Sequence, residues 1–501
     1  MLNLKRSIMK GNHFITRRWF GTFALATMST LILGSCATDG FDEDESFVRD
    51  VTNTQLLSPS ADDITITAST DGSKTVISWN IVEGAGGYNC HVLNVTDPDN
   101  PVVVKDTLMD NNTFAVTREE DTNYSFSIRT LGDEKLGNTT AEDSTVVSFS
   151  TFSPSYTTIP AGTNLTEYFA QNAIPDSSDI ITYDLEGGAE YTLSDFIDFG
   201  AHKVMLRCQN KANKAKVIMA SETAGIRTAA AMTLKNLYLD YSASSEPVIS
   251  LSKDAPASIL NLLGGTGGYY IIKDGAIYVN NCEIEGVNNK FMYDNNVKYC
   301  LENFLMDNSI VHFTSTSSIS SQAYFYYKVG FIKSLTIKNS SLYNTGVSGA
   351  KYFIQYNNSG RASRAGYGAT EKQGINLLNN TFYNLGSEGG GKFCNYDGFK
   401  GQDNSTFDIE ANIFVKCCVG DCIANRILAG RDASSYKSGV TFNLNTYWAD
   451  GAAETGFEKY DTGVVLTTDP ALVNPDAGNL TPQGAEQLSY KTGDPRWLTA
   501  E

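Results

Sequence analysis

The sequence predicts an all-β protein in which an antiparallel sandwich is followed by a solenoid of parallel strands. Residues 58–153 contain short segments in which apolar and polar residues alternate, and the chain from residue 156 onward carries an internal repeat built around asparagine. Alternation with a period of two places one face of a strand in a core. A repeat of roughly thirty to forty residues is typical of a solenoid, in which each unit buries its apolar face against its neighbours.

The predicted sandwich has turn residues between its alternating segments, which lie at residues 64–66, 75–79, 88–93 and 124–129. This part of the chain resembles a fibronectin type III module. Trp79 ends an early strand, Tyr88 opens the next, and Tyr124 stands where the tyrosine corner of such a module belongs. The resemblance implies a structural role, because these modules usually space or present a neighbouring domain.

The repeat has the pattern apolar-x-apolar-x-Asn-x-x-apolar. Five copies place the asparagine at Asn236, Asn281, Asn308, Asn339 and Asn379, and two later copies shift it by one residue, to Asn412 and Asn445. Asparagine suits a tight turn because it tolerates left-handed backbone angles, and stacked asparagines could hydrogen-bond from coil to coil. The copies begin 27 to 45 residues apart. This uneven spacing argues against propellers and leucine-rich repeats and predicts coils with loops of varied length.

The repeat region resembles the right-handed parallel β-helix of the pectin- and pectate-lyase-like superfamily. Residues 162–165 lead into a predicted capping helix, and residues 180–188 supply a first strand and a glycine-rich turn. The segments 468–480 and 493–497 resemble the ending of a family of Bacteroidetes surface lipoproteins of unassigned activity, which often belong to polysaccharide-utilisation systems. The resemblance implies a fibronectin type III-like sandwich over 58–153 and a right-handed parallel β-helix with a C-terminal extension over 156–501.

The first residues predict export and lipidation. Residues 1–35 contain five basic and no acidic side chains, followed by an apolar run too short for a spanning helix. Leu33-Gly34-Ser35-Cys36 resembles the bacterial lipobox, which implies cleavage before Cys36 and a lipid on its thiol. Residues 36–57 then form an acidic tether, whose run Asp42 to Glu45 resembles a surface-export signal. We therefore expect a lipid-anchored outer-membrane protein that faces the cell exterior.

The charge of the chain excludes some partners. Removal of residues 1–35 changes the formal charge from −18 to −23. Such a chain repels nucleic acid and anionic lipid, so membrane contact is expected through the anchor only. It also repels a polyanionic polysaccharide unless a local basic cleft or a cation intervenes. The cysteine cluster Cys417, Cys418 and Cys422 has no histidine nearby, and no metal site is predicted.

Each known chemistry of the resembling superfamily was tested against the residues. The predicted β-helix lacks Asp-Asp and Gly-His-Gly and has only two histidines, His202 and His312, which disfavours polygalacturonase-type hydrolysis. The common pectate-lyase motifs are also absent. Elimination through a lone lysine or arginine base stays open, and calcium is expected only in that case. The sequence therefore leaves open whether the protein is an enzyme.

Binding of an extracellular polysaccharide, either neutral or acidic, is the function that the sequence favours. Aromatic rings stack on the apolar faces of sugars, and arginine forks pair with sugar carboxylates. Long loops on a rigid scaffold often carry function, and residues 351–372 are the predicted wall of a binding groove. The predicted binding residues are Tyr352, Tyr356, Arg361, Arg364, Tyr326 and Trp448. The alternatives are a polysaccharide lyase that acts on a uronate polymer and a surface adhesin.

Overall fold

The computed structural model describes residues 51–70, 73–253, 261–262, 270–316, 319, 322–357, 373–386, 393–396, 405–417, 439–449, 452–453 and 463–498. Within these residues, no helix is long and apolar enough to cross a membrane. The predicted lipidation site Cys36 and the acidic run that follows it lie outside the described residues. Residues 51–57 run along the sandwich, where Leu56 is buried and its backbone N–H donates to the carbonyl of Thr139.

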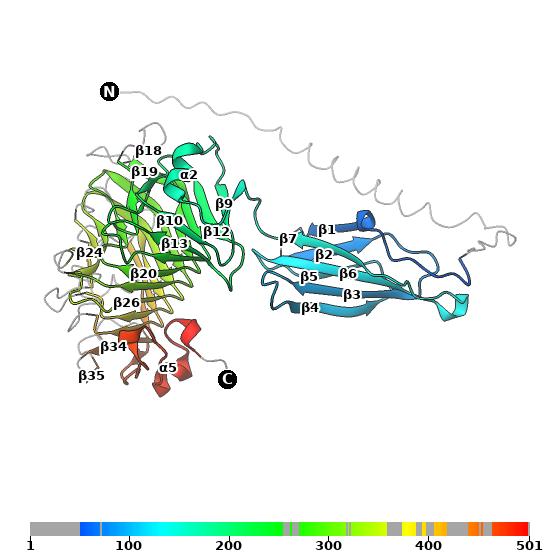
Figure 1. The fold of residues 1–501 in the computed structure, drawn as a ribbon. Helices are drawn as coiled ribbons and strands as arrows, with labels where there is room; N and C mark the ends of the chain where they lie inside the picture. Colours follow the sequence, from blue (N-terminus) through cyan, green and yellow to red (C-terminus); the bar gives the residue numbers. More distant parts are fainter. Residues whose placement is uncertain are drawn as a thin grey trace, which may run out of the picture.

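Two antiparallel sheets form the N-terminal sandwich, coloured blue to cyan in Figure 1. One sheet has the order β1 (Ile64–Ala68), β2 (Lys74–Trp79), β5 (Thr113–Thr117). The other has the order β4 (Val102–Met109), β3 (Gly87–Asn94), β6 (Asn123–Leu131), β7 (Thr145–Ser150). Short 3₁₀ turns lie at η1 (Ala61–Asp63) and η2 (Glu134–Leu136). The predicted sandwich is confirmed, because side chains along β2 and β6 alternate between buried and more exposed positions.

Aromatic side chains fill the core of the sandwich. Trp79 packs against Tyr88 with ring centroids 5.2 Å apart and against Phe126 at 6.1 Å, and all three are buried. The hydroxyl of Tyr124 accepts a hydrogen bond of 3.2 Å from the backbone N–H of Glu119, which fixes the turn before β6. The aromatic residues singled out from the sequence therefore hold the two sheets together.

The rest of the chain winds into a solenoid with three lateral sheets. The first sheet contains β8 (Thr157–Ile159), β9 (Ile181–Leu185), β12 (Val204–Cys208), β15 (Met232–Lys235), β19 (Tyr270–Asn280), β22 (Tyr299–Asp307), β25 (Phe331–Lys338), β28 (Gln373–Leu378), β31 (Ser405–Glu410) and β33 (Val440–Asn443), with β18 (Asn261–Leu262) beside β19. The second contains β10 (Glu190–Leu193), β13 (Ala215–Met219), β16 (Leu237–Asp240), β20 (Glu283–Val287), β23 (Ile310–Phe313), β26 (Ser341–Asn344), β29 (Thr381–Tyr383), β32 (Ile413–Val415), β34 (Asn445–Ala449), β35 (Ala452–Ala453) and β36 (Val465–Leu466). The third contains β11 (Ile197–Asp198), β14 (Ile226–Thr228), β17 (Ile249–Leu251), β21 (Met292–Tyr293), β24 (Ala323–Tyr327), β27 (Tyr352–Tyr356) and β30 (Cys394–Tyr396).

Each coil from β9 to β30 contributes one strand to each sheet, the described strands of the later coils belong to the first and second sheets, and strands of successive coils pair in parallel. In the second coil, for example, β12, β13 and β14 follow one another, and they pair with β15, β16 and β17 of the next coil. Figure 1 shows these strands stacked from the green to the red part of the chain. This arrangement confirms the predicted parallel β-helix.

The turn between the first and second sheets explains the asparagine repeat. Asn236, Asn281, Asn308, Asn339 and Asn379 all occupy this turn, with φ between 49° and 55°. This left-handed backbone is costly for most residues and is least so for glycine and asparagine. The side chains also bond from coil to coil: the Nδ2 of Asn281 donates to Asn236 at 2.9 Å, and that of Asn308 donates to Asn281 at 3.2 Å. The predicted coil-to-coil bonding of asparagines is confirmed for Asn236, Asn281 and Asn308, whereas the Nδ2 of Asn339 donates to Asp307 at 3.0 Å.

In the last copies of the repeat the asparagine has moved inside the coil. The left-handed turn residues there are Ala411 and Leu444, and the asparagines that follow them are fully buried. The Nδ2 of Asn380 donates to Asn412, and the Nδ2 of Asn412 donates to Asn445, each at 3.0 Å. The one-residue shift in the sequence therefore replaces a row of asparagines at the outer turn by a row of asparagines that bond to one another inside the coils.

One end and one lateral face of the β-helix are covered by other elements of the chain. Helix α2 (Leu165–Gln171) covers the first coil, with Leu165 fully buried and the side chain of Asn164 accepting from the backbone N–H of Thr166 at 3.0 Å. This is the capping helix that the sequence predicts. The C-terminal segment, residues 463–498, contains η6 (Pro475–Ala477), α5 (Ala485–Tyr490) and η7 (Pro495–Trp497) and folds back along the second sheet.

The sandwich rests on the outer face of the first sheet. Arg207 on β12 is 1% exposed; its Nε donates to Asp184 at 2.6 Å, and its guanidinium also binds Ser153 in the connection between the domains. Lys235 on β15 forms an ion pair with Asp121, which lies in the turn before β6. These bonds fix the sandwich against the early coils and cover part of the first sheet.

Candidate functional site

The outer face of the third lateral sheet carries one aligned row of side chains. Parallel pairing places these residues in register on successive strands: Asp198, Arg227, Ser250, Tyr293, Tyr326, Gln355 and Asn395. Their neighbours Met292 and Phe325 are fully buried in the core. Because side chains alternate along a strand, the row points away from the core, on a lateral face of the kind where the binding groove is predicted.

Two tyrosines and a lysine form the centre of this row. The rings of Tyr293 and Tyr326 are nearly parallel, at 2° with centroids 5.9 Å apart, and both side chains are partly exposed. The Nζ of Lys290 lies 5.0 Å from the centroid of Tyr293 and 5.9 Å from that of Tyr326. The Nδ2 of Asn357 donates to the hydroxyl of Tyr326 at 3.2 Å. Aromatic rings, an amine and an amide on one face are the groups that contact sugars.

Burial changes the acidity of Lys290. Its side chain is 8% exposed, and its Nζ donates to Asn289 Oδ1 at 3.1 Å. This burial lowers the pKa of Lys290 from 10.5 to about 8, although the charge of Glu246 acts in the opposite direction. The amine is therefore mostly charged at pH 7 and can pair with a carboxylate. Near pH 8 it is partly neutral and can accept a proton.

The structure corrects the role of the tyrosines predicted on β27. Tyr356 is 1% exposed and packs edge-on against Tyr327 inside the coil, with ring centroids 5.8 Å apart. Tyr352 is 7% exposed and has the Nζ of Lys351 5.5 Å from its ring centroid. Tyr356 therefore offers no ring face to a ligand and Tyr352 offers very little. Of the tyrosines that the sequence analysis selected, only Tyr326 lies in the outward row.

The other predicted binding residues do not join this row. Trp448 lies on β34 of the second sheet, where it lines a pocket of about 310 Å³ with Tyr383, Lys416 and Asp476. The C-terminal segment forms the other wall of that pocket. Arg361 and Arg364 lie outside the described residues. The structure thus places Tyr326 and Trp448 on different faces of the β-helix.

Metal binding was tested on the same face. The row contains a single carboxylate, Asp198, which accepts a hydrogen bond of 2.8 Å from Ser252. In the part of the chain that the structure describes, no three His, Cys, Asp or Glu side chains converge on a common point. The described residues of this face therefore do not fit calcium.

Tyr293 and Lys290 were not singled out from the sequence. Both belong to the short segment Asn289-Lys290-Phe291-Met292-Tyr293, which carries no motif. Tyr293 precedes Tyr326 by one coil, so the two lie 33 residues apart and are neighbours only through the pairing of β21 with β24. Tyr293 follows the turn residue Asn281 by 12 residues, whereas Tyr326 follows the turn residue Asn308 by 18, so an alignment of the coils through their asparagine turns does not pair the two tyrosines.

Two family models match the chain, and both describe domains of unknown function. One, DUF4992, matches residues 9–190, and the other, DUF4957, matches residues 189–345. The junction of the two models falls inside the β-helix, at the start of β10, so the first model includes the sandwich, helix α2 and the strands β8 and β9. A search of curated proteins found no match.

Several solved structures are similar to the chain. A variant of the PL6-family alginate lyase AlyGC is 13% identical with a TM-score of 0.39, and the match covers 68% of this chain and 45% of that one. The chain thus spans less than half of the length of that enzyme. Pectate lyase PelI from Erwinia chrysanthemi, in complex with tetragalacturonic acid, is 10% identical with a TM-score of 0.14, and the match covers 72% of this chain and 84% of that one. Pectate lyase Pel3 from Pectobacterium carotovorum is 11% identical with a TM-score of 0.16, covering 80% and 99%.

Proposed function

We propose that the protein is a surface lipoprotein that binds extracellular polysaccharide through the outer face of its third lateral sheet. The observation that carries this proposal is the pair of partly exposed, parallel rings of Tyr293 and Tyr326 beside the amine of Lys290. Sugars present flat apolar faces and peripheral hydroxyl groups, so aromatic rings and nearby hydrogen-bonding groups bind them together. Burial limits the conformational freedom of Lys290 before a ligand arrives, which lowers the entropic cost of binding.

The rest of the chain supports a role in display. The lipobox around Cys36 supplies the membrane anchor, and the acidic run after it supplies the signal for the outer surface. The sandwich, whose strand order and Tyr124 hydroxyl bond suit a fibronectin type III-like module, holds the β-helix away from the membrane. The ion pair of Asp121 with Lys235 and the bonds of Arg207 to Ser153 hold the sandwich at the first sheet, so that among the described residues it leaves the third sheet uncovered.

The test is retardation of the purified protein in native gels that contain one polysaccharide each, with alginate, polygalacturonate and neutral glucans in the panel. Tyr293→Ala with Tyr326→Ala should reduce the affinity for any polysaccharide that retards the wild type. By analogy with stacking on nucleic acid bases, each ring should contribute about 1–3 kcal/mol, which is about ten- to a hundredfold in affinity. Tyr490→Ala is the matched control, because Tyr490 is 49% exposed on α5, outside the row.

Retardation of the double variant equal to that of the wild type would place the binding surface elsewhere. A wild-type protein that no polysaccharide retards would contradict the proposal as a whole. The melting temperature of the double variant should stay close to that of the wild type, because both side chains project from the core.

One observation favours the alternative function, a lyase that acts on a uronate polymer. The pKa of Lys290 is lowered to about 8 by burial, so this amine can take the proton next to a uronate carboxylate at mildly alkaline pH. Elimination would then form a carbon–carbon double bond in one sugar and release the next sugar, with its oxygen reprotonated, as a new chain end. Absorbance of unsaturated uronates, present in the wild type and lost in Lys290→Met, would establish this activity. Retardation without absorbance leaves binding as the function.

A further inference from the structure

The second lateral sheet has its own row of outward side chains. Its pairing aligns Glu190 on β10, Lys216 on β13, Tyr238 on β16 and Glu283 on β20. The row continues with Ile310, Ser341, Thr381, Ile413 and Thr446. The first four positions are charged or aromatic, and the later ones are apolar or carry a hydroxyl group.

The C-terminal segment covers the second half of this row. The hydroxyl of Ser341 donates to Asp494 at 2.7 Å, and the backbone N–H of Asp494 donates to the hydroxyl of Thr381 at 3.1 Å. The side chain of Gln487 donates to Thr446 at 3.0 Å. The earliest residue of the β-helix that this segment is seen to contact is Asn308, whose Oδ1 accepts a hydrogen bond from Arg496 at 2.9 Å. The four charged and aromatic positions lie on earlier coils.

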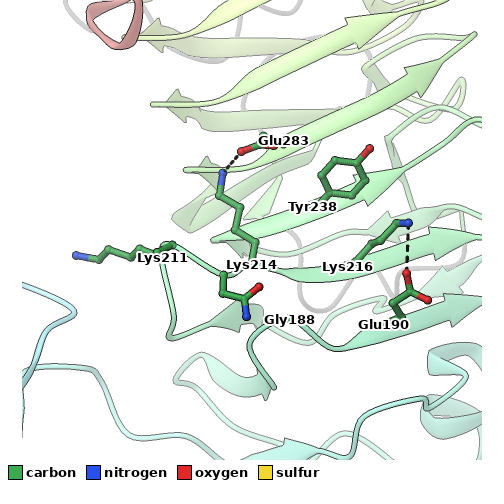
Figure 2. Close-up of a pocket in the computed structure, with 9 residues that line it drawn as sticks. Gly188, Glu190, Lys211, Lys214, Lys216, Tyr238 and Glu283 are labelled. Atoms are coloured by element: carbon green, nitrogen blue, oxygen red, sulfur yellow. Dashed lines mark hydrogen bonds and ion pairs between the residues drawn. The ribbon is translucent and has the colours of Figure 1, made fainter. Parts of the chain in front are cut away.

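An open cleft of about 450 Å³ lies over these four positions (Figure 2). The turn that joins β12 to β13 forms one wall and contributes Lys211 and Lys214, which Lys216 follows on β13. Figure 2 shows the side chain of Lys214 directed toward Glu283 and that of Lys216 lying between Glu190 and Tyr238. The volume suits one or two sugar units, because drug-sized ligands occupy pockets of roughly 300–1,000 Å³.

The cleft carries more positive than negative charge. Three lysines and two glutamates line it, whereas the whole chain has 38 basic and 56 acidic residues. Lys214 is 13% exposed and its Nζ lies 2.6 Å from Glu283, so this pair is held in place. Lys211 is exposed and has no ion-pair partner among the described residues. A local excess of ammonium groups on an acidic protein attracts anions that the rest of the surface repels.

Lys216 is the group best placed to change partner. Its Nζ is 3.4 Å from Glu190, and the two side chains are 37% and 65% exposed. A pair of this kind contributes about 0–1 kcal/mol, so a ligand anion can replace the glutamate at little cost. The same Nζ lies 5.7 Å from the ring centroid of Tyr238, whose side chain is partly exposed. An anionic sugar could therefore place its charge on Lys216 and its ring near Tyr238.

We propose that this cleft is a second saccharide site, which binds an anionic sugar through Lys211 and Lys216 while Glu190 and Glu283 accept its hydroxyl groups. It goes beyond the surface on the third sheet, because it lies on a different face and selects for charge. The anion is a carboxylate or a sulfate on the sugar. Such a cleft lets a chain of formal charge −18 hold a polyanion without a bridging cation.

The test compares charged and neutral forms of one polymer, with a chelator present to remove bridging cations. Polygalacturonate is compared with its methyl-esterified form, and dextran sulfate with dextran, so that the two pairs distinguish carboxylate from sulfate. Lys211→Gln with Lys216→Gln should lower the affinity for at least one charged polymer about tenfold at low ionic strength, and the difference should fade as salt screens the charges. Lys214 is left unchanged because its partly buried pair with Glu283 supports the fold.

The matched control is Lys74→Gln with Lys105→Gln, which removes the same charge from exposed positions on the sandwich. Equal losses in the cleft variant and the control would overturn the proposal, because they would show a general effect of net charge. A wild type that prefers neither charged polymer over its neutral form would also overturn it. The variant of Tyr293 and Tyr326 tests the third-sheet surface independently. If that variant loses binding to neutral and charged polymers alike, the third-sheet surface is supported even when the cleft proposal is overturned.

Discussion

The two halves of the second lateral sheet have the same backbone and opposite surfaces. In the early coils, the outward positions hold Glu190, Lys216, Tyr238 and Glu283, and an open cleft lies over them. In the later coils, the equivalent positions hold Ile310, Thr381 and Ile413, and the C-terminal segment covers them. Parallel pairing fixes the direction in which these side chains point. The presence or absence of a covering segment determines whether a charged side chain is tolerated at each position.

The difference follows from the cost of desolvation. A charged side chain that a second layer covers loses its water and must find a partner inside the protein. The covered half accordingly has apolar groups and hydroxyls, and the buried carboxylate of Asp494 is bound by Ser341 and by Arg496 at 2.8 Å. The open half keeps its charges in water, where they cost little and remain available to a ligand. Uncovered charges on a β-helix are thus the first place to seek function.

The largest expected effect comes from the contact between the covered half and its cover. Leu480 is fully buried in a cluster with Tyr343, Tyr383 and Ile413. Leu480→Ala should lower the free energy of unfolding by about 2–5 kcal/mol, because it leaves a cavity in that cluster. Urea denaturation followed by fluorescence measures this loss. A change below about 1 kcal/mol would mean that the segment is loosely attached and that the two halves differ less than the contacts indicate.

The introduction of a charged side chain should change the free energy of unfolding by different amounts in the two halves. Thr381 is fully buried under Asp494, so Thr381→Lys should cost about 3 kcal/mol or more, because it buries an ammonium in a filled site. The reciprocal change Lys216→Thr in the open half should alter stability by less than about 1 kcal/mol. The midpoints of urea denaturation for the two variants give the comparison. Similar costs at both positions would remove the distinction between covered and open surface.

A smaller effect is expected from pH, through Lys290 on the third sheet. Its pKa is 10.5 when free and about 8 in the folded chain, so between these values the unfolded chain binds more protons. The free energy of unfolding should therefore rise with pH across this window through this group. Lys290→Gln should flatten the rise by an amount on the order of 1 kcal/mol, since one pKa unit corresponds to about 1.4 kcal/mol.

Urea denaturation of both proteins between about pH 8 and pH 10 measures the difference in slope, to which buried tyrosines such as Tyr183, with a pKa of about 12 in the folded chain, do not contribute because they are present in both. Lys74→Gln on the sandwich is the control, because Lys74 is exposed and should leave the slope unchanged. Identical slopes for the wild type and Lys290→Gln would show that the amine of Lys290 is hydrated in the folded protein.

The fold was predictable from the sequence because its signals are local. Alternation in residues 75–79 and 124–129 marks strands of the sandwich, and asparagine marks the left-handed turns at Asn236 to Asn379. Even the shift of the repeat to Asn412 and Asn445 was visible in the sequence. The structural consequence of this shift was not predictable from the sequence. Whether an asparagine points out at the turn or into the core depends on which residue takes the left-handed backbone conformation.

The site was less predictable because it is assembled across coils. Alternation assigns Tyr352 and Tyr356, four residues apart, to the same side of a strand, but it does not say whether that side is the core, and in the structure all five residues of β27 are buried. Lys216, Tyr238 and Glu283 come from three different coils, and loops of varied length separate them in the sequence. The cluster Lys211-Ala-Asn-Lys214-Ala-Lys216 was visible as a basic stretch in an acidic chain, yet nothing in the sequence places it over a tyrosine.

Hydrogen–deuterium exchange with and without a polysaccharide that retards the protein shows whether polysaccharide binds where the β-helix is uncovered. We expect slower exchange at residues 289–293 and 323–327 of the third sheet, and at residues 211–216 when the polymer is charged. We expect no change at residues 341–344 and 381–383, which the C-terminal segment already covers. Protection confined to the sandwich or to residues 463–498 would contradict binding at the uncovered faces.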